Sequence, residues 1–278
     1  MAPERTPMTD RVAIATVVRM GSGPPRTDQD LVAAEAPLSV DVRHPASPEL
    51  IKLGLLMRTP GDDDDLVRGL LLSEGLIRTA TDIEGVTIDA GPDGGMVAIV
   101  TLAAGVPMPA GAERGAATAS SACGLCGRLE MRAVEHGGRS LDVPRYEAAA
   151  IARIPSSLRN GQTVFAETGG LHAAALVGAD GQPAILREDV GRHNAVDKVI
   201  GAALVAGRLP ASGDLLAVSG RVAYEIVQKA AAAGVAGIVA VGAPSSLAVE
   251  AARAAGLTLI GFARDGRFNI YTGHERVQ

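Results

Sequence analysis

The chain has very few cysteines and very few aromatic side chains. Its 278 residues include two cysteines, no tryptophan, three tyrosines and three phenylalanines. Two cysteines are too few for a secreted scaffold held together by disulfides, and a reactive pair suits a reducing compartment. Because aromatic residues make up only 2% of the chain, the core must be filled by alanine, valine, leucine and isoleucine.

An excess of basic residues is also absent. Lys and Arg number 26 against 31 Asp and Glu, which gives a net charge of −5. This balance excludes a general electrostatic attraction to nucleic acid, so we expect no nucleic-acid partner. It is still compatible with a local basic pocket for one phosphorylated ligand.

Long hydrophobic runs are absent as well. Residues 1–10 contain no apolar core of a signal peptide, and the apolar run 12–18 is short and bounded by Arg11 and Arg19. The longest run of small apolar residues, 230–243, is interrupted by glycine and is better explained as a helix followed by a strand. We therefore expect a cytoplasmic protein with no membrane partner.

The chain is long enough for two domains, and 47% hydrophobic residues are ample for a core. The first part, residues 1–116, has the pattern of a small α+β domain. Strands are predicted over 11–19, 31–43, 53–57, 84–89 and 96–103, with a helix over 62–74. A connector with the cysteines follows over 117–145.

The last part, residues 146–278, predicts an α/β domain. A helix over 155–165 precedes a hairpin of strands over 171–177 and 184–186. Helices over 192–206, 222–233 and 245–255 then alternate with strands over 215–218, 237–241 and 257–262. These strands are apolar throughout and do not alternate apolar with polar residues. Such strands, when they are joined by helices, indicate a parallel sheet with helices on both faces.

The two cysteines lie close together in a loop of small residues, as Cys123-Gly-Leu-Cys126. Such a pair can form a reversible disulfide, supply half of a metal site, carry sulfur as a persulfide or fill space. A zinc site normally needs four ligands, and no second cysteine pair exists, so we expect no metal here. An exposed loop suits the transfer of sulfur between partners, and glycine-flanked thiols fill a core poorly.

Four consecutive aspartates, Asp62 to Asp65, open the predicted helix over 62–74. Capping of the helix and its macrodipole explain them better than a metal site does.

Three loops of the last part are predicted at the carboxyl ends of parallel strands, where ligands of open sheets gather. They are 219–221, 242–246 and 262–267. Their glycines permit close approach of a ligand, and two of them precede helices whose free N–H groups suit a phosphate. Arginine side chains add charge-assisted contacts to a phosphorylated or nucleotide-like ligand. The candidate binding residues are Ser219, Arg221, Phe262, Ala263, Arg264, Asp265, Gly266 and Arg267.

Two histidines, His172 and His193, follow glycine-containing turns and are further candidates at this edge. The zinc deaminase motifs H-x-E and P-C-x-x-C are both absent from the sequence.

Seven motifs taken together resemble the FdhD family, the formate dehydrogenase accessory sulfurtransferases. The long motif over 187–198 is the most specific of them. The set is Thr59-Pro-Gly-Asp62, Leu71-Leu-Ser-Glu-Gly75, Cys123-Gly-Leu-Cys126-Gly, Thr168-Gly-Gly-Leu-His172, Arg187-Glu-Asp-Val-Gly-Arg-His-Asn-Ala-Val-Asp-Lys198, Ser219-Gly-Arg221 and Gly261-Phe-Ala-Arg-Asp-Gly-Arg-Phe-Asn-Ile-Tyr271.

The resemblance implies a cytidine-deaminase-like α/β fold without the deaminase zinc, and a cytoplasmic homodimer. It also implies a sulfur relay, in which a cysteine desulfurase loads Cys123 as a persulfide and Cys126 is its partner. The acceptor is the bis(molybdopterin guanine dinucleotide) cofactor of formate dehydrogenase, and residues 262–267 fall where the family binds it. Residues 1–30 take no function from the resemblance.

Two other functions are left open by the residues. The chain can act as a chaperone that binds and delivers the cofactor without carrying sulfur, or as a redox regulator through a Cys123–Cys126 disulfide. Replacing Cys123 and Cys126 one at a time by alanine separates these cases.

Overall fold

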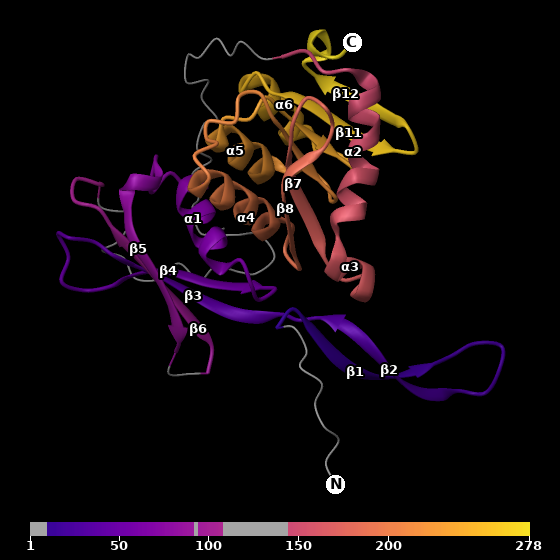
Figure 1. The fold of residues 1–278 in the computed structure, drawn as a ribbon, viewed down its shortest axis with the longest axis horizontal. Helices are drawn as coiled ribbons and strands as arrows, with labels where there is room; N and C mark the ends of the chain where they lie inside the picture. Colours follow the sequence, from indigo (N-terminus) through magenta and orange to yellow (C-terminus); the bar gives the residue numbers. More distant parts are fainter. Residues whose placement is uncertain (1–9, 92–93, 108–143) are drawn as a thin grey trace.

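The structure is a computed structural model that describes residues 10–91, 94–107 and 144–278. Within these ranges the fold is mixed α/β, with three sheets and six α-helices. Figure 1 shows the first two sheets in the indigo to magenta part of the chain and the largest sheet in the salmon to yellow part. No helix in the described ranges is long and apolar enough to cross a membrane.

The four-stranded sheet has the order β4-β3-β6-β5. Its strands are β3 (Ala36–Arg43), β4 (Ile51–Arg58), β5 (Ile83–Ala90) and β6 (Met96–Leu102), and β3 pairs with β6 in parallel. Alternate residues Leu38, Val40 and Val42 of β3 are buried, as expected for a strand with one covered face. Helix α1 (Asp63–Ser73) shares their hydrophobic cluster through residues such as Leu66 and Leu70.

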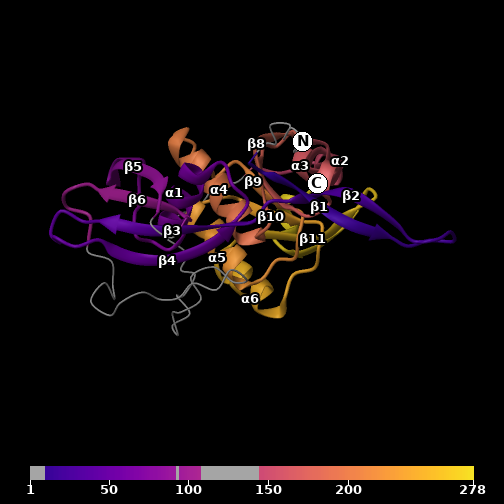
Figure 2. The ribbon, with the colours of Figure 1, turned by 90° about the horizontal axis from the view of Figure 1, so that it is seen from below.

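A separate ribbon is formed by β1 (Val12–Arg19) and β2 (Arg26–Ala33), which pair only with each other among the described strands. Both ribbon views show it extending away from the body on the side opposite the four-stranded sheet (Figures 1 and 2). Its base is held by Val12, which packs with Val164 and Leu171. The outer part is exposed, with 61% of Val18 and 75% of Met20 accessible.

The six-stranded sheet has the order β12-β11-β10-β9-β7-β8. Strands β9 (Leu215–Val218), β10 (Gly237–Ala240) and β11 (Thr258–Arg264) are mutually parallel, which confirms the prediction from their apolar sequences. The antiparallel neighbours are β7 (His172–Val177), β8 (Pro183–Asp189) and β12 (Arg267–Thr272). The prediction did not include β12.

Helices cover both faces of the six-stranded sheet. One face packs on α4 (Arg192–Val205), α5 (Tyr224–Ala233) and α6 (Ser246–Ala254), and the other on α2 (Ala148–Gly161). The alternation is visible in β7, where Ala174 and Leu176 face the first group and Ala173 and Ala175 face α2. The predicted two-sided burial of this sheet is therefore confirmed.

The two larger sheets are joined by the crossing of α1 and α4, and α1 lies between the four-stranded sheet and α4 in Figure 1. The helix backbones touch where two glycines meet. A Cβ on Gly69 would overlap the carbonyl oxygen of Asp197, and one on Gly201 would overlap that of Asp65. Only glycine permits this approach. One hydrophobic cluster consequently extends from residue 38 to residue 259.

Two local predictions differ from the structure. The strand predicted over 31–43 is divided between β2 and β3. The helix predicted over 155–165 begins earlier, at Ala148, and is interrupted at Gln162 before the short helix α3 (Thr163–Thr168). Proline favours the first turn of a helix, and so Pro155 suggested a start that lies inside α2 instead.

The prediction for the aspartates at the start of α1 is confirmed only in part. Asp63, Asp64 and Asp65 lie in the first turn of the helix, where the macrodipole favours carboxylates. Asp62 is the N-cap residue, but its side chain makes no capping hydrogen bond, so the capping part of the prediction is wrong. Each carboxylate instead pairs with an arginine. The pairs are Asp62 with Arg11, Asp63 with Arg58, Asp64 with Arg68, and Asp65 with Arg187.

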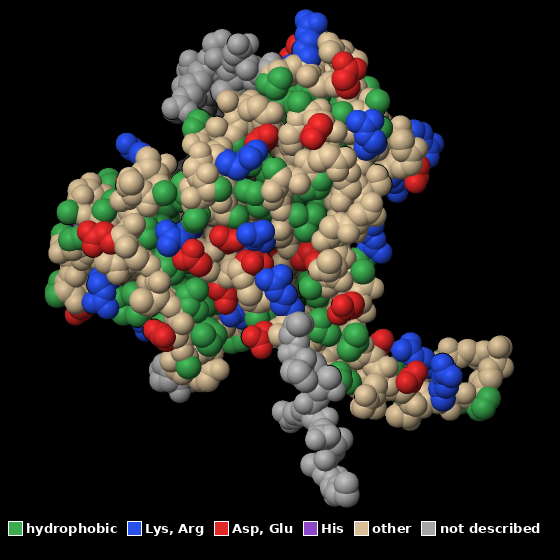
Figure 3. Space-filling model, viewed as in Figure 1, with side chains coloured by type: hydrophobic (Ala, Val, Ile, Leu, Met, Phe, Trp, Pro, Cys, Tyr) green, Lys and Arg blue, Asp and Glu red, His purple; other side chains and the backbone are tan. Residues whose placement is uncertain are grey.

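Acidic and basic side chains are interspersed over the face shown in Figure 3, where the described residues form no large area of one sign. This agrees with the near balance of charges in the sequence.

Candidate functional site

The three predicted strand-end loops lie next to one another at one edge of the six-stranded sheet. The amide of Gly242 donates to the carbonyl of Gly220 at 3.1 Å, and the amide of Phe262 donates to the carbonyl of Gly242 at 3.0 Å. Gly242 is needed for this contact, since a Cβ there would lie 2.7 Å from the Gly220 oxygen. The backbones of the three loops therefore lie side by side along this edge of the six-stranded sheet.

Ser219 links this edge to β7. Its hydroxyl oxygen accepts a hydrogen bond from the Ala173 amide at 2.9 Å, and its own amide donates to the Ala173 carbonyl. The hydroxyl proton of Ser219 remains able to donate to a ligand. Arg221, two residues further on, is exposed.

Residues 262–267 form a hairpin between β11 and β12, where the sequence predicted a loop after a strand. Asp265 and Gly266 have φ of 52° and 73°, as a tight two-residue hairpin turn requires. Phe262 also has a positive φ, of 54°, and its side chain is 39% exposed. Arg264, Asp265 and Arg267 are exposed, whereas Ala263 is fully buried in the core facing α2. Ala263 can therefore contact a ligand through its backbone only.

His172 opens β7 beside the Gly220 loop, and a Cβ on Gly220 would lie 3.3 Å from its Nδ1. Burial lowers the pKa of His172, and the neighbouring Arg192 guanidinium lowers it further. A neutral imidazole has one nitrogen that donates and one that accepts, so His172 can do both at neutral pH.

His193 lies in the first turn of α4 and is buried, with no hydrogen-bond partner for its Nε2 among the described residues. Burial, with Arg192 and Lys229 as further causes, lowers the pKa of His193 to about 4. The charge of His172 contributes to this lowering, so the two rings are near each other, but only His172 lines the cavity that is described next.

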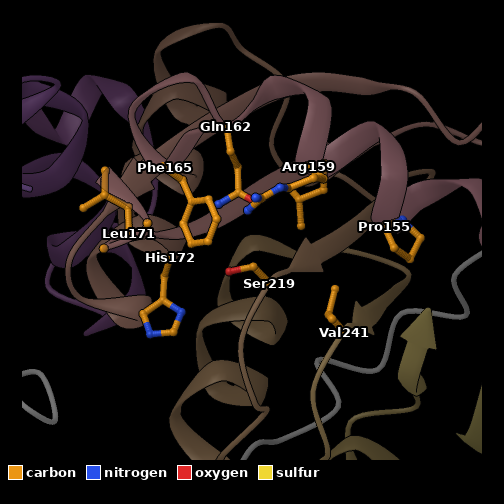
Figure 4. Close-up of a pocket in the computed structure, with 11 residues that line it drawn as sticks. Pro155, Arg159, Gln162, Phe165, Leu171, His172, Ser219 and Val241 are labelled. Carbon is orange, nitrogen blue, oxygen red and sulfur yellow. The ribbon is translucent and has the colours of Figure 1, made fainter. Parts of the chain in front are cut away.

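A cavity of about 490 Å³ opens between α2, α3 and the sheet edge (Figure 4). Cavities of this size hold small ligands. Its walls come from segments far apart in the sequence: Pro155, Leu158, Arg159, Gln162, Phe165, Gly169, Gly170, Leu171, His172, Ser219 and Val241. Sequence reasoning found His172 and Ser219 but missed the rest, because the break of the helix at Gln162 has no clear sequence signal.

One wall of this cavity is held by Glu188. Its carboxylate accepts hydrogen bonds from the amides of Val164 at 3.0 Å and Phe165 at 2.8 Å, at the N-terminus of α3. The Arg159 guanidinium carbon lies 4.0 Å from the centre of the Phe165 ring, in cation–π contact.

Asp189 fixes the start of α4 behind the edge. It is fully buried and accepts hydrogen bonds from the amides of Thr59 and Gly191 and from the Asn194 side chain. The carboxylate oxygen that accepts from Thr59 is also 2.8 Å from the buried ammonium group of Lys198. These contacts hold the first turn of α4 in one arrangement, and no role for Asp189 was predicted.

Cys123 and Cys126 lie outside the described residues. Described residues before and after residues 108–143 are held by hydrogen bonds. The carbonyl oxygen of Val106 is 2.8 Å from His44 Nε2, and the buried Tyr146 donates its hydroxyl to the Gly213 carbonyl at 3.1 Å. Among the described residues there is no cluster of three or more His, Cys, Asp or Glu that could hold a metal.

Comparison with known proteins adds three findings. The model of one family, FdhD/NarQ, matches residues 33–278. The sulfur carrier protein FdhD of Streptomyces avermitilis is 45% identical over 271 residues, with 94% of each chain covered, and that of Anaeromyxobacter sp. is 48% identical, with 96% of this chain and 93% of that protein covered. A crystal structure from Desulfotalea psychrophila, described as a proposed formate dehydrogenase accessory protein, has a TM-score of 0.76 at 23% identity and covers 96% of this chain and 100% of that one. That last likeness shows the same mixed α/β fold.

Proposed function

The chain belongs to the FdhD/NarQ family, and from this premise we propose that it is a sulfurtransferase that carries sulfur on Cys123. The donor is a cysteine desulfurase, and the acceptor is the bis(molybdopterin guanine dinucleotide) cofactor before it enters formate dehydrogenase. The observation that carries the proposal is the Cys123-x-x-Cys126 pair in a chain about 45% identical to proteins named sulfur carriers.

The loading step is a thiol exchange. The Cys123 thiolate attacks the outer sulfur of the donor persulfide, the donor S–S bond breaks, and the donor cysteine leaves as a thiolate. Cys123 then holds a persulfide. Release follows if the Cys126 thiolate attacks the inner sulfur, which forms a Cys123–Cys126 disulfide and expels sulfide to a soft metal such as molybdenum. Formation of the disulfide supplies the two electrons that reduce the outer sulfur to sulfide, so the transfer is balanced.

The sheet edge supports binding of the guanine dinucleotide. Arg264 and Arg267 are exposed and suited to phosphates, and the Asp265 carboxylate suits the donor edge of guanine. The backbone line through Gly220, Gly242 and Phe262 gives close approach for a ligand. We further propose that the six-stranded sheet and its helices form a cytidine-deaminase-like fold and that the protein acts as a homodimer in the cytoplasm.

Mass spectrometry tests the proposal directly. The purified protein is incubated with a cysteine desulfurase and cysteine, and the peptide that contains Cys123 is analysed with and without mild reductant. A gain of one sulfur atom that reductant removes is expected in the wild type and in Cys126→Ala, but not in Cys123→Ala. No gain in the wild type with an active desulfurase would overturn the carrier role.

A second candidate function is a chaperone that binds and delivers the cofactor. It is favoured by the cavity and the exposed arginines, since none of the described residues that form them is a cysteine. Formate dehydrogenase activity in cells that produce only Cys123→Ala separates the two. Activity near that of the wild type supports the chaperone, and its loss supports the sulfur carrier.

A further inference from the structure

The ribbon of β1 and β2 carries a concentration of exposed apolar side chains, far from the edge of the six-stranded sheet that carries the candidate site. Eleven large hydrophobic side chains are exposed among the described residues, and five of them lie within residues 12–33. Their exposed fractions run from 37% for Val32 to 75% for Met20. Because an isolated two-stranded ribbon is at best marginally stable in water, such a surface indicates a partner that covers it.

The pairing register assigns the ribbon's side chains to two faces, since side chains alternate along a strand. One face carries no charge, and its cross-strand pairs are Val12 with Ala33, Ile14 with Leu31, Thr16 with Gln29 and Val18 with Thr27. At the base of this face Val12 is buried and packs with Val164 and Leu171. Further out, Ile14 is 51% exposed and Val18 is 61% exposed. The uncharged face is therefore covered at its base and open to solvent beyond it.

The opposite face carries all four charged residues of the ribbon. Arg19 pairs with Asp28 at 2.8 Å and with Asp30 at 3.2 Å, and the Arg26 guanidinium lies 4.0 Å from Asp28. Figure 3 shows these basic and acidic side chains together on the ribbon. The ribbon thus has no net charge, and its charges are paired with one another.

This distribution of charge favours a second copy of the chain as the partner. Transient partners are steered and selected by complementary charge, which a ribbon without net charge does not provide. The interfaces of homodimers are more apolar than ordinary protein surface, as the uncharged face is.

The size of the ribbon decides how two copies meet. Eight residues at about 3.3 Å each give a length of about 26 Å, and two strands with their side chains are about 10 Å wide, so one face covers about 260 Å². Two ribbons packed only on each other would bury about 500 Å², well below the roughly 1,000 Å² of a specific interface. Two ribbons that each lie on the body of the other copy would bury about 1,000 Å². Reciprocal contact between ribbon and body is therefore the arrangement that suffices.

We propose that the β1–β2 ribbon is a dimerisation arm, which lays its uncharged face on the body of a second copy and receives that copy's arm in return by two-fold symmetry. The inference rests on the proposed function only for the existence of the homodimer, and it adds the surface that forms it. Almost all of the ribbon precedes residue 33, where the match to the family model begins, so that match gives it no role.

Sedimentation velocity of the purified full chain tests the arm, and the wild type should sediment as a dimer at micromolar concentration. Val18→Lys places an ammonium group on the uncharged face. It should raise the dissociation constant of the dimer at least about a hundredfold, because symmetry places the new charge in the interface twice. Leu31→Lys, on the other strand of the same face, should act in the same way, whereas Val18→Ile should keep the dimer. Val18 is largely exposed, so its replacement should not affect folding.

Two controls separate the arm from other surfaces. Val205→Lys changes a valine that is 58% exposed at the end of α4, and Arg26→Ser changes the charged face of the ribbon. Both variants should remain dimers. A dimer that persists in Val18→Lys would overturn the arm and leave the homodimer standing, and a monomeric wild type would overturn both. A monomeric wild type that binds a cysteine desulfurase only while Val18 is intact would assign the ribbon to that enzyme instead. Sulfur loading of Cys123 is measured separately, so failure of the arm and failure of the sulfur carrier can be told apart.

Discussion

Replacing Asp189 by asparagine removes the negative charge that faces the fully buried ammonium group of Lys198 at 2.8 Å. One carboxylate oxygen of Asp189 accepts from the Gly191 amide and the Asn194 side chain, and the other accepts from the Thr59 amide. Whichever way an asparagine amide is turned, its NH₂ group faces other donors. The Asp189→Asn variant thus leaves the Lys198 ammonium group, which still donates to the Thr59 carbonyl, without its counter-charge, and leaves at least one backbone donor without a partner.

The expected cost follows from these contacts. Breaking a buried ion pair by removing one partner costs about 3–5 kcal/mol. With an unfolding entropy of about 2.1 cal/mol/K per residue, a chain of 278 residues should lose about 5–9 °C in Tm. Differential scanning calorimetry of Asp189→Asn measures this loss.

The matched control is the same substitution in an exposed pair. Asp28 pairs with Arg19 on the ribbon at 2.8 Å, with both side chains 43% exposed, so Asp28→Asn should leave Tm nearly unchanged. Adding Lys198→Met to Asp189→Asn removes the unpaired charge and should recover much of the lost Tm. If Asp189→Asn has the same Tm as the Asp28→Asn control, this account of the buried contacts of Asp189 is refuted.

Two further predictions concern helix packing and pH. Gly201→Ala places a methyl group against the Asp65 carbonyl oxygen and should lower the free energy of unfolding, measured in urea, by about 1–3 kcal/mol or more. The control is Gly213→Ala, whose added Cβ has no atom within 4 Å, and it should leave the free energy of unfolding unchanged. Equal values for the two variants would contradict the close crossing of the helices. Because the pKa of His193 is about 4 when folded and 6.5 in its ordinary state, the unfolded chain binds an extra proton between these values, and stability should fall by about 3 kcal/mol as the pH drops from 6.5 to 4. Chemical unfolding between pH 6.5 and 4 measures how steeply the stability depends on pH. This dependence should be weaker in His193→Gln and unchanged in a variant of the exposed His274. An unchanged dependence in His193→Gln would contradict the burial of His193.

The parallel part of the large sheet could be predicted because its information is local. Residues 215–218 and 237–240 are uninterrupted apolar runs, and helices with their own apolar faces separate them. The motif over 187–198 likewise indicated a helix after a turn, where α4 begins at Arg192. The adjacency of the three strand-end loops follows from the same topology.

The cavity could not be predicted because it depends on contacts between distant residues. Its walls combine residues 155–172 with Ser219 and Val241, and the position of Phe165 depends on Glu188. The aspartates at the start of α1 gave the same difficulty. Their partners Arg11 and Arg187 lie on other elements, so the sequence indicated capping and the macrodipole but could not indicate these ion pairs.

The glycine crossing of α1 and α4 has a consequence for cooperativity. Because Gly69 and Gly201 bring the two backbones together, the leucine face of α1 and the core of the large sheet belong to one hydrophobic cluster. A fragment that ends near residue 116 would lack α4 and leave part of that face in water. The four-stranded and six-stranded sheets are therefore expected to unfold in a single transition, and neither half should behave as an independent folding unit.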